Sequence, residues 1–291
     1  MLFLQKTAMI DPVRALARKG ERDMQEQSAA PAAEDCLVLE TAMEAGHILL
    51  ENGAEIFRVE ETMERISSRF GVEQRDFFVL SNGIFTTGSD NHHKGGAYAR
   101  VQHIPVKGAR LDKVVAVNQL SRDIEAGKCD LYQARERLAD IRAMPEKKPL
   151  HRVLACGTGA GCFCYLFGGG LTDSAAAFLV GILLQLALLG AARTKMSRIV
   201  VNICAGGFVT FLCLLLCSAG LGSSLSHMII GSIIPLVPGV PFTNGIRDIV
   251  DADYIAGSVR LLDAIITFVC VAVGVGTVFT IYHRLFGGAF L

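Results

Sequence analysis

The sequence predicts an α-helical integral membrane protein with about five transmembrane helices and an N-terminal cytosolic α+β domain. The first observation is an uneven charge distribution: only eleven of the chain's 28 basic and 28 acidic side chains lie in residues 153–291. The second observation is that this half contains apolar runs close to the roughly 20 residues that a bilayer-spanning helix requires. Because a charge at the bilayer centre costs at least about 2.5 kcal/mol, spans of this kind exclude charges.

Three regions are predicted along the chain. Residues 1–34 are expected to be a disordered tail, because their polar and small side chains show no periodicity and their apolar patch is too short for a signal peptide. Residues 35–149 are expected to form the α+β domain, and residues 150–291 the five-span transmembrane domain. Two prolines, Pro145 and Pro149, close the α+β domain.

Helices are predicted over 36–50 and 56–70, where apolar residues recur every three or four positions. Asn52-Gly53 and Gly71 are expected to end them, because glycine readily adopts the left-handed conformation that stops a helix. Two more helices are expected over 111–124 and over 130–141, the second with Asp130 as its N-cap.

Residues 74–104 are predicted to be β structure, with two arrangements open. Asn82-Gly83 can form a type I′ hairpin turn. Alternatively, one long strand runs to Thr87, followed by a loop over 88–96 and a return strand over 98–104. We favour the long strand, because 88–96 is the denser cluster of glycine and polar residues.

Five spans are predicted, at 153–170, 173–192, 199–219, 226–244 and 259–282. The first is rich in glycine, and Gly157 with Gly161 indicates a close approach between helices. Basic residues precede the first span and follow the second and fourth spans, whereas the loops after the first and third spans contain none. The positive-inside rule therefore predicts that the N-terminal domain is cytosolic and that the C-terminus is outside.

The fourth predicted span contains the most informative motif. Three prolines and Gly239 lie within seven residues, which prevents a regular helix. In lipid, the freed backbone groups need protein or a wet cavity as partners. Transporters place substrate sites at broken helices of this kind. We therefore treat Pro238 and Gly239 as the centre of a candidate transport site.

Three polar residues follow this break directly. Asn244 offers neutral hydrogen bonds, Arg247 is a candidate partner for a substrate carboxylate, and Asp248 is a candidate acceptor for a proton or an ammonium group. The alternative interpretation is a kinked helix that ends in an interfacial Arg–Asp pair. We favour the transport site.

Asp173, at the start of the second span, also has two interpretations. We favour an N-cap, because Thr172-Asp173-Ser174 is suitable for capping and an acidic residue stabilises a helix N-terminus. The other interpretation is a substrate or proton site. Asp263 either reaches the interface or faces a cavity, and the sequence does not decide between these.

Several classes of function are not indicated. A net charge of zero gives no basic stripe for nucleic acid. There is no nucleophile elbow, P-loop, HExxH or GxGxxG motif, so no catalytic residue and no enzyme activity are predicted. The cysteines lack zinc-site spacing, and His92-His93 is more typical of a solvated turn than of a metal site. No cofactor and no metal are expected.

Two motifs, at residues 51–62 and 235–260, together resemble the threonine/serine exporter family in its half-length, YjjP-like form. The resemblance extends over roughly residues 36–283. It is carried in the first motif by Gly53, Glu55, Arg58, Glu60 and Thr62, and in the second motif by Pro238, Gly239, Asn244, Arg247, Asp248, Asp253, Gly257 and Arg260.

This resemblance implies a multi-pass protein of the bacterial inner membrane, with a cytosolic domain before five spans. It implies proton-motive-force-driven export, as by an antiporter, of threonine and serine or of a dicarboxylate such as succinate. It also implies a small multi-span membrane subunit as partner, and a homo-oligomer is a further option. In the first motif, Glu55, Arg58 and Thr62 are expected to share one helical face as a packing or docking surface.

Two other functions stay open beside transport. One is a membrane-anchored enzyme whose site includes Asn91, His92 and His93. The other is a sensor or assembly scaffold in which the soluble domain gates or oligomerises the spans.

Overall fold

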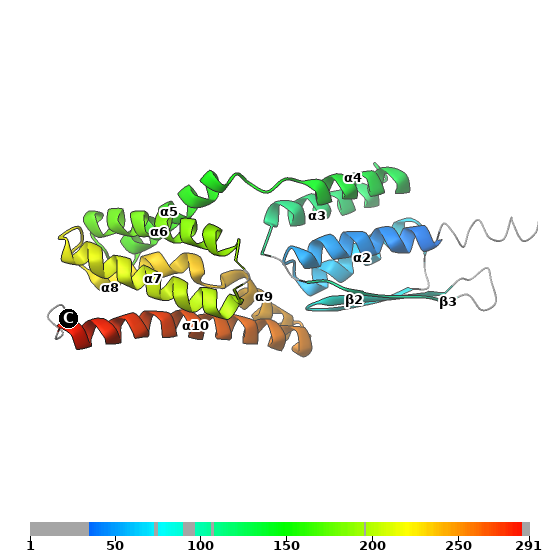
Figure 1. The fold of residues 1–291 in the computed structure, drawn as a ribbon. Coiled ribbons are helices and arrows are strands. Elements are labelled where there is room, and N and C mark those ends of the chain that lie inside the picture. Colours follow the sequence, from blue (N-terminus) through cyan, green and yellow to red (C-terminus); the bar gives the residue numbers. More distant parts are fainter. Residues whose placement is uncertain (1–34, 73–74, 90–96, 106–107, 195, 287–291) are drawn as a thin grey trace, which may run out of the picture. The chain divides into compact units, whose positions relative to one another are not determined.

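A computed structural model describes residues 35–72, 75–89, 97–105, 108–194 and 196–286 (Figure 1). The chain forms two compact units that meet between Met144 and Pro145. The predicted tail over 1–34 and the predicted turn at His92-His93 lie outside the described residues.

The N-terminal unit combines helices with one antiparallel sheet. Its elements are a helix over 35–51, α2 (Ile56–Arg69), β1 (Arg75–Leu80), β2 (Gly83–Ser89), β3 (Ala97–His103), α3 (Leu111–Glu125) and α4 (Leu131–Ala143). The predicted helices are confirmed. Gly53 and Gly71 follow the first two helices with φ of +81° and +84°, and Asp130 caps α4 by accepting the amide of Gln133 at 2.7 Å.

The favoured single long strand is wrong, because the chain turns back at Ser81-Asn82. β1 and β2 pair as a hairpin, with Leu80 opposite Gly83, and β3 pairs with β2 as the predicted return strand. In a continuous strand, Val79 and Ile84 would face opposite sides, since five positions separate them. The hairpin buries both as cross-strand partners. Neither turn residue has a positive φ, so the turn is not of type I′ either.

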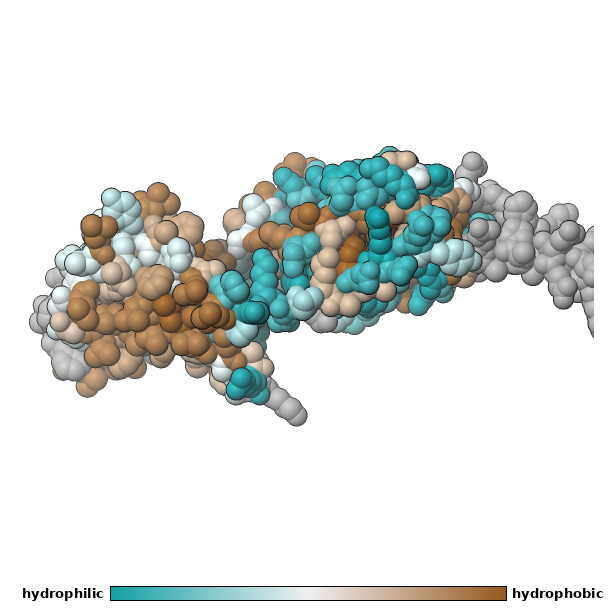
Figure 2. Space-filling model, turned by 90° about the horizontal axis from the view of Figure 1, so that it is seen from above, coloured by the Kyte–Doolittle hydropathy of each residue, from teal (hydrophilic) through white to brown (hydrophobic). Residues whose placement is uncertain are grey.

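The C-terminal unit consists of helices whose visible surface is largely apolar in Figure 2. Its elements are α5 (Pro149–Leu166), α6 (Leu171–Ala191), α7 (Arg198–Ser218), α8 (Leu225–Ile233), the short 3₁₀ helix η1 (Ile234–Leu236), α9 (Gly239–Val250) and α10 (Tyr254–Phe286). Among the described helices, α6, α7 and α10 are long and apolar enough to cross a membrane. The bent segment from α8 to α9 makes a fourth if it is one span. The Gly-rich α5 is not among them, so five spans stay a prediction.

Glycines set the distance between these helices. A Cβ on Gly161 of α5 would lie 2.9 Å from the carbonyl oxygen of Ser174, and a Cβ on Gly181 of α6 would lie 2.9 Å from the carbonyl oxygen of Cys156. A Cβ on Gly206 of α7 would lie 2.6 Å from the carbonyl oxygen of Val271 in α10. The predicted close approach at α5 is confirmed, as expected where small residues let helix backbones meet.

The helix directions define a path for the chain. Arg198 pairs with Asp263 near the starts of α7 and α10, and Gly206 contacts Val271 further along both helices, so α7 and α10 run parallel. The chain leaves α7 at Ser218 and enters α10 beside the opposite end of α7. The segment from α8 to α9 therefore returns the chain along the length of α7.

Replacing Gly161 by alanine is expected to lower the stability of the C-terminal unit by about 1–3 kcal/mol, because the added methyl group overpacks the contact with α6. Gly159 is the matched control on the same helix, since a Cβ there meets nothing within 4 Å. Thermal unfolding of the purified full chain in detergent measures the difference. Equal unfolding temperatures for Gly161→Ala and Gly159→Ala would contradict the packing described for α5 and α6.

Candidate transport site

The break between α8 and α9 is built from prolines that occupy helix starts. Pro235 lies in η1, Pro238 is the N-cap residue of α9, and Pro241 lies in its first turn. The first turn of a helix has unsatisfied amides in any case, so proline removes no helical hydrogen bond there. Val237 is extended and the two halves are bent by 65°. The predicted interruption of the span is confirmed.

The three polar residues after the break do not share one environment. Asp248 is buried at 2% exposure, Asn244 is half-buried and Arg247 is exposed. The helix therefore presents Arg247 and Asp248 in different directions, rather than as one charged pair at its end.

Asp248 pairs with Arg260 of α10, whose side chain is 11% exposed. The Asp248 Oδ2 and Arg260 Nη1 atoms lie 3.1 Å apart. The sequence singled out Arg260 only within the family motif and did not identify it as this partner. Asp248 and Arg260 are twelve residues apart and lie on two helices joined by a turn. Helical periodicity therefore could not predict their contact.

A tight turn and two glycines bring the pair together. Ala252 adopts a φ of +68°, and the amide of Asp253 donates to the carbonyl oxygen of Asp248 at 2.8 Å. Asp253 then caps α10 by accepting the amide of Ala256 at 3.2 Å. A Cβ on Gly257 would lie 2.8 Å from the carbonyl oxygen of Gly245, so these helices pack backbone to backbone.

Asp173 belongs to a different part of the unit. Its buried carboxylate accepts the amides of Gly170 at 3.0 Å, Ser223 at 2.6 Å and Ser224 at 3.1 Å. The favoured N-cap interpretation is corrected: Gly170 is the N-cap of α6, and Asp173 lies three residues inside the helix. The carboxylate joins the loop before α6 to the loop after α7, at the end of α7 opposite the Arg198–Asp263 pair.

The family motif of α2 lies in the N-terminal unit. The Glu60 carboxylate accepts the amide of Val79 at 3.1 Å and so attaches α2 to β1. Arg58 is exposed and lies 3.6 Å from Glu55, whereas Thr62 is buried. The three residues therefore do not form one docking surface: Glu55 and Arg58 form an ion pair near the surface, and Thr62 lies in the core.

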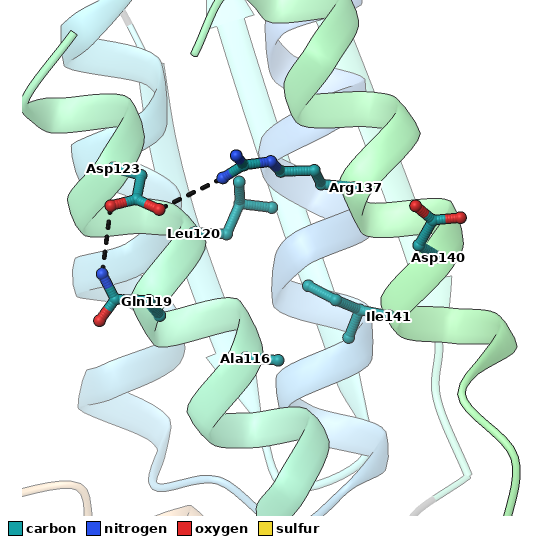
Figure 3. Close-up of a pocket in the computed structure, with 7 residues that line it drawn as sticks. All are labelled: Ala116, Gln119, Leu120, Asp123, Arg137, Asp140 and Ile141. Carbon is teal, nitrogen blue, oxygen red and sulfur yellow. Dashed lines mark hydrogen bonds and ion pairs between the residues drawn. The ribbon is translucent and has the colours of Figure 1, made fainter. Parts of the chain in front are cut away.

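The N-terminal unit has a surface groove of about 290 Å³ between α3 and α4 (Figure 3). On its rim, Arg137 Nη1 lies 3.2 Å from Asp123 Oδ2, and Gln119 donates to Asp123 Oδ1 at 3.1 Å. Asp123 is therefore paired with both Arg137 and Gln119, and the seven lining residues include no cysteine, serine, threonine, lysine or histidine.

His47 is a buried histidine of this unit. Burial, followed by the nearby Arg142 guanidinium, holds the pKa of His47 below its usual value. The Arg142 Nη2 and His47 Nε2 atoms lie 3.4 Å apart. Within the described residues, no three His, Cys, Asp or Glu side chains are grouped to hold a metal ion.

A buried ion pair beside a broken apolar helix is typical of membrane transport proteins. The chain's sequence fits this class. The family model described as "Putative threonine/serine exporter" matches residues 40–282, so the chain belongs to this family. The family is one of transporters rather than enzymes.

Two relatives are both named "Probable succinate transporter subunit YjjP". The protein of Klebsiella aerogenes is 23% identical over 256 residues, which cover 87% of this chain and 97% of that protein. The protein of Escherichia coli strain K12 is 25% identical over 249 residues, which cover 84% and 94% respectively. No solved structure matches the chain.

Arg260→Ala is expected to lower stability by about 3–5 kcal/mol, because it leaves the buried Asp248 carboxylate without its cation. Arg198→Ala is the control, since it breaks an exposed ion pair between α7 and Asp263 of α10, which contributes about 0–1 kcal/mol. Thermal unfolding in detergent compares the two variants. A loss for Arg260→Ala no greater than that for Arg198→Ala would mean that the pair is not buried.

Proposed function

We propose that this chain is one subunit of a secondary exporter for a small carboxylate-bearing metabolite in a bacterial inner membrane. The observation that carries the proposal is the Asp248–Arg260 pair, buried in an apolar unit directly beside a broken helix. A buried ion pair adds little net stability over an apolar packing of the same volume, so its presence in such a unit favours a functional role.

Five crossings are proposed, with α5 as the first and the segment from α8 to α9 as the fourth. The parallel directions of α7 and α10 support this, because the chain must cross once between them. The basic residues also support it. Lys147 and Lys148 precede α5 and Arg152 lies in its first turn, Arg193 follows α6, and Arg247 and Arg260 flank the turn after α9. By the positive-inside rule this end, and the N-terminal unit before it, is cytosolic.

The proposed site divides substrate binding from proton handling. The exposed Arg247 binds a substrate carboxylate, and Asn244 adds a neutral hydrogen bond. Asp248 accepts a proton, which removes its charge and releases Arg260 for the substrate. Return of this proton to the cytosol re-forms the ion pair. The availability of Arg260 to the substrate therefore depends on the protonation of Asp248, which is how the proton-motive force would act on this site.

The substrate is a threonine- or serine-like zwitterion or a dicarboxylate. The family description supports the amino acids. The names of both relatives support succinate. Its two carboxylates would fit two arginines, Arg247 and Arg260. Alternatively, Arg247 could bind the carboxylate of a zwitterion while the Asp248 carboxylate binds its ammonium group.

A second, smaller membrane subunit is proposed as the partner. Both relatives are named as subunits of a transporter. The apolar residues exposed along α10 are available for lipid or for such a subunit; they include Ile255, Val259, Leu262, Ile266, Val269 and Val273.

Arg247→Ala is expected to reduce efflux of labelled succinate, threonine or serine at least tenfold in cells that also express the proposed smaller membrane subunit. The physical reason is the loss of the proposed cation for the substrate carboxylate. Arg193→Ala, which removes an exposed cation after α6, is the control and should keep normal efflux. Immunoblots of isolated membranes show whether both variants insert. Normal efflux from an inserted Arg247→Ala protein would refute this site.

A further inference from the structure

A second cationic site lies at the start of α5, away from the Asp248–Arg260 pair in the sequence. A cavity of about 550 Å³ there is lined by Lys147, Lys148, His151, Arg152 and Ala155. Three of these five residues are permanent cations and a fourth is a histidine. All five are exposed, so the cavity is open to a ligand.

The charges of this cavity are incompletely neutralised. Arg152 lies 3.7 Å from Glu146, whose side chain is 78% exposed, and such a surface pair is weak. In the described part of the chain, no carboxylate lies within ion-pair distance of Lys147, Lys148 or His151. The first turn of α5 adds the positive end of the helix dipole to the same place. The cavity therefore favours an anion.

Apolar side chains on another face of α5 favour a lipid over a small soluble anion. Lys148 and Arg152 are four residues apart, so they lie on one face of the helix start. Leu150 and Leu154 are also four residues apart and are 64% and 46% exposed. At about 100° per residue, the leucines face away from Lys148 and Arg152, and they suit the acyl chains of a bilayer whose headgroups reach the cavity.

We propose that the cavity at Lys147, Lys148, His151 and Arg152 binds the phosphate of an anionic phospholipid. Clusters of basic residues at the cytosolic start of a membrane helix recognise anionic headgroups in this way. Bound lipid would fix the depth of α5, the least apolar of the five proposed crossings. The proposal requires that α5 enters the membrane, but it is independent of the transported substrate.

The test measures binding of fluorescent phosphatidylglycerol to the full chain purified in an uncharged detergent. The variant Lys147→Ala/Lys148→Ala/Arg152→Ala should bind about a hundredfold more weakly, since each basic side chain near an anionic headgroup contributes about fivefold. The charge-preserving variant Lys147→Arg/Lys148→Arg/Arg152→Lys should stay within about threefold of the natural chain.

A matched variant, Arg193→Ala/Arg198→Ala/Arg284→Ala, removes three exposed cations elsewhere in the same unit and should bind normally. Fluorescent phosphatidylcholine should bind weakly to all variants. Inorganic phosphate and succinate, each in millimolar excess, should not displace phosphatidylglycerol.

Two results would overturn the proposal. Equal loss of binding in both triple-alanine variants would indicate non-specific attraction of a cationic surface. Displacement by inorganic phosphate or succinate in millimolar excess would assign the cavity to a soluble anion. Neither result depends on efflux, so the proposed transport function would stand or fall separately.

Discussion

The ion pair between Asp248 and Arg260 fixes the second half of the broken helix against α10. Its atoms are 3.1 Å apart in a unit whose other helix contacts are almost entirely apolar. Arg260 can reach Asp248 because the turn at Ala252 reverses the chain and because Gly245 and Gly257 let the backbones meet. A larger residue at either glycine would separate the helices and leave two charges buried apart, which is far less favourable than burying them together.

The rest of the C-terminal unit is arranged around this attachment. Because α7 and α10 are parallel, the segment that ends in α9 must return the chain between them. The Asp173 carboxylate holds the opposite end by accepting amides from the loop after α7. The two acidic residues thus serve different purposes: Asp173 satisfies backbone donors, whereas Asp248 neutralises a side-chain cation.

Local features of the fold could be predicted from the sequence, and non-local ones could not. Helical periodicity located the helices, Asp130 was identified as a cap, and the prolines located the break. The hairpin was missed because glycine and polar residues are denser at 88–96 than at Asn82-Gly83. The informative feature was that Val79 and Ile84, five positions apart, can face the same side only if the chain turns between them. The partners of Asp248 and Asp173 were missed because they are brought near by turns, which leave no periodic pattern. The candidate site was therefore predicted as a set of polar residues, but not as a buried pair.

The account depends most directly on the segment from α8 to α9 crossing the membrane once, with its ion-paired end in the cytosol. Single cysteines at Leu221→Cys and Asp251→Cys, in a chain whose nine native cysteines are replaced, report the two ends of this segment. A membrane-impermeant maleimide should label Leu221→Cys in intact cells and Asp251→Cys only after the inner membrane is permeabilised. Labelling of both positions in intact cells, or of both only after permeabilisation, would show that the segment enters and leaves on one side and would contradict the account.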